Sequence, residues 1–346
     1  MGSEVGSEVG TAQAGVVDYG VQVHLAISGS IATDHLMTFP GKFADSLVPD
    51  QLDKISLSFL VEDLDVRRGG CGANIAFGLA QLGHRTLLVG AVGQDFEAEY
   101  RGWLDEAGID TSGVLVSDSR HTARFVCTTD SDHAQIATFY AGAMAEARDI
   151  DLFALGQDFD LVLIAPDDPE GMVRHTQACR DHGVPFAADP SQQLAWADGD
   201  VIRELIDGAE YLFSNDYEAA LIQQKTGWSE ADVHAHVTTC VTTRGKDGVT
   251  VYTHDGQPID VPAIDGVIAV DPTGVGDSFR AGFLAGVAAG LSFERSAQVG
   301  CTIAAAVVET KGTQEYTLHR ETFLKRIGAT YGDAARDEVD AALSLA

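Results

Sequence analysis

Residues 271–282, DPTGVGDSFRAG, carry the pattern that decides the fold. A proline and two glycines make a tight turn that leads into a helix, and glycine has no Cβ to hold a ligand away from the backbone. The backbone N–H groups of Gly274, Val275 and Gly276 would then lie at the helix N-terminus. There, together with the positive end of the helix dipole, they would form an anion hole for a phosphate group.

Asp277 directly follows this predicted anion hole. A carboxylate would repel phosphate at this position unless it had a chemical task, and the natural task is to accept the proton of an attacking hydroxyl. The alternative interpretation is that the aspartates of the motif only cap a helix, but the complete string is too particular for capping alone. The motif therefore predicts phosphoryl transfer to an alcohol, with Asp277 as the base.

Strand-like and helical segments alternate around this motif, which indicates a mostly parallel sheet covered by helices on both faces. The fold class we predict is therefore α/β. The expected strands are residues 21–29, 86–93, 161–165, 185–188, 211–214 and 241–243, and the expected helices are residues 73–82, 170–182, 200–208, 216–225, 230–236, 275–289, 293–309 and 320–345.

Two stretches break the alternation, because they contain short β-rich pieces without helices between them. We expect about residues 37–68 and 113–140 to form a small lid over one edge of a main domain that spans residues 21–346. Such a lid would exclude water from a phosphoryl-transfer site. Residues 1–20, which contain GSEV twice in tandem, are expected to be a disordered extension.

The composition excludes several classes of protein. The net charge of the 346-residue chain is −30, and a nucleic-acid surface needs basic stripes. The sequence contains no run of eighteen or more apolar residues, so we expect no membrane span. The N-terminus lacks a basic region followed by an apolar stretch, so we expect no secretory signal. The five cysteines are widely spaced and form no CxxC pair, so the pattern favours a cytoplasmic protein without a zinc knuckle or a disulfide framework.

Three further motifs lie where an α/β fold would bring loops together. Residues 69–74, GGCGAN, place a diglycine turn and Asn74 before an alanine-rich helix, and an asparagine amide can both donate to and accept from a hydroxyl. Asn215 and Glu218 form an NxxE motif directly after a predicted strand. Residues 242–248, TTRGKDG, form a turn between strands. Each motif alone is compatible with an ordinary turn or helix start, and together they indicate one site.

The combination resembles the PfkB, or ribokinase-like, carbohydrate kinases, from about residue 23 to residue 314. The resemblance implies a ribokinase-like fold, ATP as co-substrate and Mg²⁺ as cofactor, and it leaves a K⁺ requirement open. It implies that Asp277 is the catalytic base and that Glu218 organises Mg²⁺ through water. The ATP-binding residues that it implies are Asn215, Thr243, Gly245, Gly248 and Gly276. Arg244 departs from the family pattern, which often has an apolar residue at this place in the ATP turn.

Longer strings, among them ISGSIATDHLMTFPGKF, AADPSQQLA and KGTQEY, are similar to bacterial adenosine kinases of the actinobacterial type. This resemblance implies transfer of the ATP γ-phosphoryl group to the 5′-hydroxyl of adenosine, giving AMP and ADP. It assigns ribose binding to Asp34, Gly70 and Asn74 and assigns the flanking of adenine to Phe125 and Phe139, because aromatic faces suit a flat base. The remaining residues of the implied nucleoside site are Ser30, Ser58, Gln192 and Gln193.

Other interpretations stay open. Each phenylalanine alone could be ordinary packing between lid and main domain. The substrate could be ribose, fructose, guanosine or inosine, because fold alone does not choose among them. A non-catalytic purine-binding protein is disfavoured by the intact motifs around Asp277. The exposed strand edges of the lid could pair in a homodimer, which the sequence does not decide.

Overall fold

The computed structural model describes residues 23–47, 54, 56–254 and 256–345. Its main element is a nine-stranded sheet with the strand order β13-β12-β11-β10-β9-β8-β1-β4-β5. All neighbouring strands from β11 to β5 pair in parallel, and the hairpin partners β12 and β13 are antiparallel. The strands are β1 (Leu25–Ser28), β4 (Leu87–Gly93), β5 (Asp110–Ser117), β8 (Leu161–Ile164), β9 (Phe186–Ala188), β10 (Tyr211–Asn215), β11 (Thr239–Thr243), β12 (Val249–Thr253) and β13 (Ile259–Val261).

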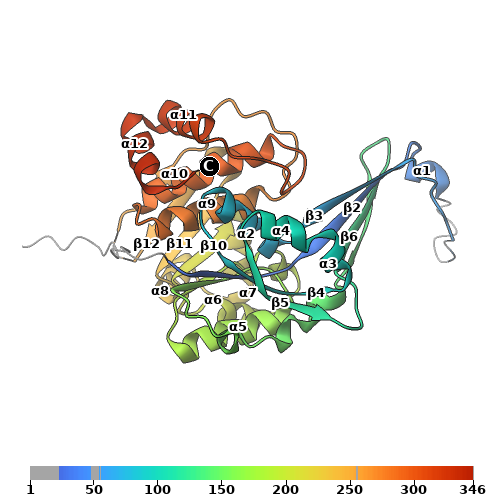
Figure 1. The fold of residues 1–346 in the computed structure, drawn as a ribbon, viewed down its shortest axis with the longest axis horizontal. Coiled ribbons are helices and arrows are strands. Elements are labelled where there is room, and N and C mark those ends of the chain that lie inside the picture. The colour runs from blue at the N-terminus through green and yellow to red at the C-terminus, as the bar shows by residue number, and fades with distance from the viewer. Residues whose placement is uncertain (1–22, 48–53, 55, 255, 346) are drawn as a thin grey trace, which may run out of the picture.

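Helices cover both faces of this sheet, as the alternating pattern predicted (Figure 1). One face packs against α2 (Cys71–Gln81), α9 (Val275–Ala288) and α10 (Phe293–Val308), with α11 (Arg320–Tyr331) and α12 (Asp333–Ala342) outside them. The other face packs against α5 (Pro169–His182), α6 (Gly199–Ile206), α7 (Asp216–Thr226) and α8 (Glu230–His236). The central strands β1, β4 and β8 are buried along their whole length, which explains why they read as continuous apolar runs.

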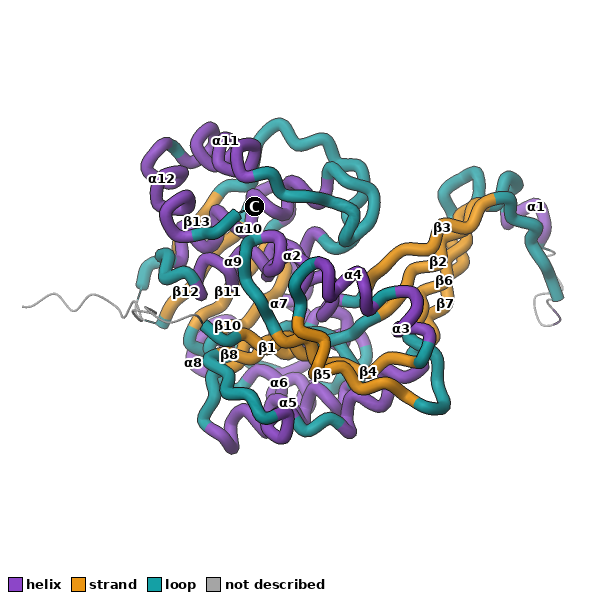
Figure 2. The backbone as a smooth tube through the Cα atoms, in the orientation of Figure 1, coloured by secondary structure: helices purple, strands orange, loops and turns teal. Residues whose placement is uncertain are grey.

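A second sheet of four strands forms the lid, in the order β3-β2-β6-β7. Its strands are β2 (Ala32–Thr38), β3 (Asp63–Gly69), β6 (Ala123–Thr129) and β7 (Gln135–Tyr140). Figure 2 shows these strands extending away from the main body, with the short helix α1 (Phe43–Ser46) at their far end. The remaining short elements are α3 (Asp95–Glu99), α4 (Arg101–Glu106), η2 (Gly142–Asp149), η3 (Leu152–Leu155), η4 (Ser191–Ala195) and η5 (Gly245–Asp247).

The structure corrects two boundaries. Residues 113–117, which we expected in the lid, belong to β5 at the edge of the main sheet, and the lid begins earlier than expected, at Ala32. The tail 320–345 is two helices instead of one, because Gly332 adopts a φ of 92° between them. The predicted extension 1–20 lies outside the described residues. Among the helices that the structure describes, none is long and apolar enough to cross a membrane.

Candidate active site

A cleft of about 1150 Å³ lies between the lid and the carboxyl ends of the central strands. Open α/β sheets place their ligands at this end of the strands, where loops from several strands converge. The volume exceeds what one small ligand needs and leaves room for two substrates side by side. Most residues that the sequence singled out line this cleft: Ser30, Asp34, Gly70, Asn74, Phe125, Phe139, Gln192, Gln193, Asn215, Glu218, Thr243, Gly274, Gly276 and Asp277.

A chain of hydrogen bonds holds Asp277 in place. The Asn74 side-chain amide donates to Asp277 Oδ2 over 2.8 Å, and Gln314 Nε2 donates to Asn74 Oδ1 over 2.9 Å. The Trp103 indole N–H in turn donates to Gln314 Oε1 over 3.1 Å. The Cys71 side chain is a further hydrogen-bond partner of the Asp277 carboxylate, which lines the cleft where a substrate would bind.

The environment also tunes the acidity of Asp277. Loss of hydration raises the pKa of Asp277 to about 6, against the opposing effects of the Asn74 hydrogen bond and the Arg280 charge. A base with this pKa is ionised at neutral pH and still binds a proton more readily than an ordinary carboxylate. Burial likewise raises the pKa of Asp34 to about 6, with a further contribution from nearby Glu315.

The start of α9 provides unpaired backbone donors next to Asp277. Gly274 takes the N-cap position with a φ of 73°, and no described side chain caps this helix. The Val275 N–H faces the Pro272 carbonyl at 3.5 Å, and the N–H groups of Gly274, Gly276 and Asp277 have no partner among the described residues. Asp271 does not cap the helix. Its carboxylate accepts from the backbone N–H groups of Thr273 and Gly312, so it holds the turn.

A buried arginine links this helix start to the two neighbouring strands. Arg280 forms an ion pair with Asp189 at the end of β9, and its Nη2 donates to Ser191 Oγ over 3.0 Å. The same nitrogen lies 4.0 Å from the Glu218 carboxylate. Glu218 also accepts from the Asn215 N–H over 2.8 Å, in the capping box that begins α7. Burial raises the pKa of Glu218, while the Asn215 hydrogen bond opposes the shift.

One row of side chains crosses the inner face of the lid. Asp34 on β2 pairs in register with Phe125 on β6, and Phe125 pairs with Phe139 on β7. Residues paired directly across a sheet project from the same face, so this row presents a carboxylate followed by two aromatic rings. Phe139 is 51% exposed and Phe125 is half-buried, and both line the cleft. Neither ring is part of the buried core, which removes the interpretation of simple packing for Phe139.

The diglycine turn lets the chain approach this row closely. Gly70 has a φ of 92°, and a Cβ at this position would lie 2.5 Å from the Ser30 carbonyl oxygen. A Cβ on Gly69 would lie 2.9 Å from the Asp34 carboxylate. Gly70 therefore requires glycine, because a Cβ there would collide with backbone atoms, and a Cβ on Gly69 would displace the Asp34 carboxylate.

Four predicted site residues do not line the cleft. Ser58 is exposed between α1 and β3. Gly245 and Gly248 lie in the turn between β11 and β12. Thr243, at the end of β11, lines the cleft, but these two glycines do not. Val275 faces the preceding turn through its amide.

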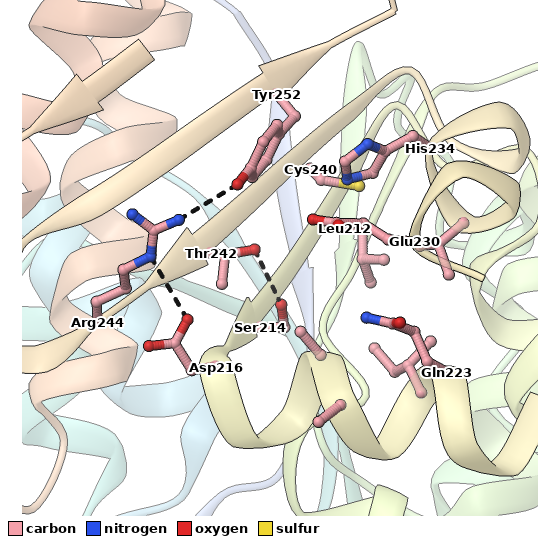
Figure 3. A pocket seen from close by; sticks show the side chains of 14 residues that line it. Leu212, Ser214, Asp216, Gln223, Glu230, His234, Cys240, Thr242, Arg244 and Tyr252 are labelled. Atoms are coloured by element: carbon pink, nitrogen blue, oxygen red, sulfur yellow. Dashed lines mark hydrogen bonds and ion pairs between the residues drawn. The ribbon is translucent and has the colours of Figure 1, made fainter. Parts of the chain in front are cut away.

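Arg244 points into a different pocket. This pocket, of about 200 Å³, lies between α7, α8 and the strands β10 to β12 (Figure 3). The Arg244 guanidinium lies 3.5 Å from the Asp216 carboxylate and donates to the Tyr252 hydroxyl over 3.2 Å. The departure from the family pattern therefore turns its side chain away from the main cleft, which Arg244 does not line.

Comparisons with known proteins agree with this geometry. Residues 40–320 match the pfkB family of carbohydrate kinases. A nucleoside kinase from Methanothermobacter thermautotrophicus is 33% identical over 290 residues, covering 82% of this chain and 92% of the relative. The structure of Burkholderia thailandensis nucleoside kinase in complex with inosine is 35% identical, with a TM-score of 0.78 and coverage of 89% of this chain and 98% of that one. The Methanocaldococcus jannaschii nucleoside kinase, an archaeal member of the ribokinase family, is 28% identical, with a TM-score of 0.79 and coverage of 88% and 98%.

The chain therefore belongs to the pfkB family of carbohydrate kinases, and it is a kinase with the ribokinase-like fold.

Several residues that shape the cleft were absent from the sequence-based prediction. Arg280 and Asp189 had no signal beyond their places in two quoted strings, because their pairing joins segments far apart in the chain. Gln314 lies within the quoted string KGTQEY, but its role as the partner of Asn74 needs the fold. Asp167, which lines the cleft next to Gln193, was also missed.

Proposed function

We propose that this kinase phosphorylates nucleosides, with adenosine as its substrate and the 5′-hydroxyl as the acceptor. The observation that carries the proposal is the lid row, in which a carboxylate precedes two aromatic rings on the inner face. Asp34 suits the paired hydroxyls of a ribose, and the faces of Phe125 and Phe139 suit a flat base. A free sugar would need only the first of these features. The nucleoside kinases among the relatives support the same substrate class.

Asp277 is the proposed base. Its carboxylate accepts the proton as the 5′-oxygen attacks the γ-phosphorus, and the bond from that phosphorus to the bridging oxygen of ADP breaks. The Asn74 hydrogen bond keeps the carboxylate oriented before substrate arrives. The free N–H groups at the start of α9 stabilise the negative charge on the phosphoryl oxygens, and their positions need no rearrangement during the reaction.

The triphosphate would extend from this helix start toward Thr243 and Asn215, which line the same cleft. Among the described residues, no three His, Cys, Asp or Glu side chains gather as a cage for a metal ion. Mg²⁺ does not require such a cage, because it keeps several waters and binds mainly through substrate phosphates. Glu218 is the carboxylate placed to accept from those waters, and bound Mg²⁺ would neutralise charge on the phosphates.

The first test is ADP formation by the purified protein with ATP and Mg²⁺. Adenosine, inosine, guanosine, ribose and fructose are compared, each in K⁺ and in Na⁺ buffer, with Asp277→Asn as the matched inactive control. We expect turnover with adenosine that the variant lacks. Turnover with ribose or fructose and none with any nucleoside would refute the proposal and leave only the kinase chemistry.

Inosine is the second candidate substrate. The observation that favours it is the similarity to the Burkholderia thailandensis structure, which was solved with inosine bound. Adenine and hypoxanthine differ in hydrogen-bonding groups at N1 and C6 but present the same aromatic face, so the stacking row accepts either. A kcat/KM for inosine above that for adenosine in the same assay would make inosine the substrate.

A further inference from the structure

Asp167 is a buried carboxyl group in the wall of the cleft that nothing above employs. It follows β8 and is only 2% exposed, yet it lines the cleft. Its Oδ1 accepts from the Asp168 N–H over 2.9 Å, and its backbone carbonyl accepts from Gln193 Nε2 over 2.8 Å. Its Oδ2 is buried and has no hydrogen-bond partner among the described residues. An unpaired buried oxygen costs free energy, so a partner is expected from the ligand.

The position of Asp167 corresponds to the base end of the cleft. Its neighbour Asp168 pairs with Arg148 of η2, the segment that directly follows β7. Met144, also in η2, lines the cleft together with the two phenylalanines of the lid row. Asp167 is therefore linked through Asp168 and Arg148 to the segment that follows the lid row, and its carbonyl is bound by Gln193, whereas Asp277 lies at the start of α9.

We propose that Asp167 Oδ2 reads the nucleobase, donating a hydrogen bond to a ring nitrogen of the purine. The inference rests on the proposed nucleoside substrate and adds a residue that determines specificity for the base. A purine ring offers N1, N3 and N7 as acceptors in adenosine. A base without an acceptor at the correct place would leave Oδ2 unpaired and would bind weakly.

The protonation state of Asp167 agrees with a donor. Burial raises the pKa of Asp167 to about 8, and the adjacent Asp168 carboxylate contributes in the same direction, against the hydrogen bond from the Asp168 N–H. The carboxyl is therefore neutral at pH 7, and with Oδ1 engaged as an acceptor its proton belongs on Oδ2. The charged and titratable groups on the segments packed around it are Arg148, Asp168, Glu170, His175, Asp189 and Arg280.

The experiment measures kcat/KM for adenosine and for 1-, 3- and 7-deazaadenosine, each of which replaces one ring nitrogen by C–H. Wild-type protein, Asp167→Asn, Asp167→Ala and the exposed control Asp158→Asn are compared at pH 7. We expect wild type, Asp167→Asn and the control to reject one analogue by about 10- to 100-fold, because the asparagine amide also donates. Asp167→Ala is expected to accept that analogue nearly as well as adenosine.

In the ratio of kcat/KM for an analogue to kcat/KM for adenosine, the contribution of every group that acts on both substrates alike, including Asp277, cancels. With wild type, the rejection should fade as the pH rises through 8 and the donor is lost, whereas with Asp167→Asn it should persist. Equal use of all analogues by all variants would overturn the inference, and loss of rejection in Asp167→Asn would overturn the donor role. Absence of any nucleoside turnover by wild type would instead refute the proposed function.

Discussion

Replacing Asp277, the proposed catalytic base, by asparagine should stabilise the ligand-free protein while removing its activity. The pKa of Asp277 is raised from 3.8 to about 6, so the folded state holds the ionised form less favourably than the unfolded chain does. One pKa unit corresponds to about 1.4 kcal/mol, and the shift therefore costs the folded state about 3 kcal/mol once Asp277 is ionised. Asp277→Asn removes this cost, whereas loss of a general base lowers kcat by about 10²- to 10⁴-fold.

The sign of the pH dependence follows from the direction of the shift. Because the folded pKa of Asp277 lies above the unfolded value, the destabilisation is absent below pH 3.8 and complete above pH 6. The variant should therefore match wild type in stability near pH 4 and exceed it at pH 8. For a chain of 346 residues, about 3 kcal/mol corresponds to a Tm increase of about 4 °C.

The assay is urea unfolding and thermal unfolding of both proteins, without nucleoside or ATP, at pH values from 4 to 8. Asp232→Asn is the control, because hydrogen bonds from Ser229 lower the pKa of Asp232, and the same chemical change should there reduce stability at pH 8. Equal stability of wild type and Asp277→Asn at pH 8 would refute the reasoning. A stability gain that persisted unchanged at pH 4 would show that its cause is not ionisation.

Three further changes test other parts of the cleft. Phe139→Ala should raise the KM for nucleoside by about 5- to 150-fold, because the stacking face is lost. The free energy of unfolding should stay unchanged, because the ring is half exposed. Tyr140→Ala, on the opposite face of β7, is the control and should not alter KM. Gly70→Ala should cost about 1–3 kcal/mol in denaturant unfolding and more than Gly108→Ala, since both have positive φ but only Gly70 faces a backbone oxygen within 2.5 Å. Arg280→Met should cost about 3–5 kcal/mol by leaving Asp189, the buried carboxylate that follows β9, without its charge partner, and an unchanged unfolding midpoint would contradict the importance of that ion pair.

Local patterns in the chain were sufficient for six parallel strands of the main sheet, β1, β4 and β8 to β11, and for the longer helices, whereas β5, β12, β13 and the short helices α3 and α4 were not among the expected elements. The buried central strands read as continuous apolar runs, and helix starts such as that of α7 carry a capping box that is visible in the sequence. The boundary of β5 was missed because a strand at the sheet edge and a lid strand have the same short-range pattern. Only the pairing partner distinguishes them, and that partner lies elsewhere in the chain.

The distribution of candidate residues over the site was less predictable. Ser58 was assigned to the nucleoside site by resemblance, but its side chain is exposed and does not line the cleft. Arg244 occupies the predicted turn, yet it pairs with Asp216 and lines the pocket between α7, α8 and the strands β10 to β12 instead of the cleft. In both cases the residue type and spacing were compatible with the cleft, and the direction of the side chain depended on neighbours distant in sequence.

The sequence by itself predicted phosphoryl-transfer chemistry, because a turn of proline and glycines before a helix favours an anion hole through local backbone geometry, and an aspartate beside it is suited to act as a base. Tertiary structure alone decided how that base is held and what lies opposite it. The contact from Gln314 to Asn74 and the register from Asp34 to Phe125 and Phe139 join segments that are far apart in the chain. Such contacts follow from packing and strand pairing, which depend on the whole fold and leave no periodic signal in any one segment.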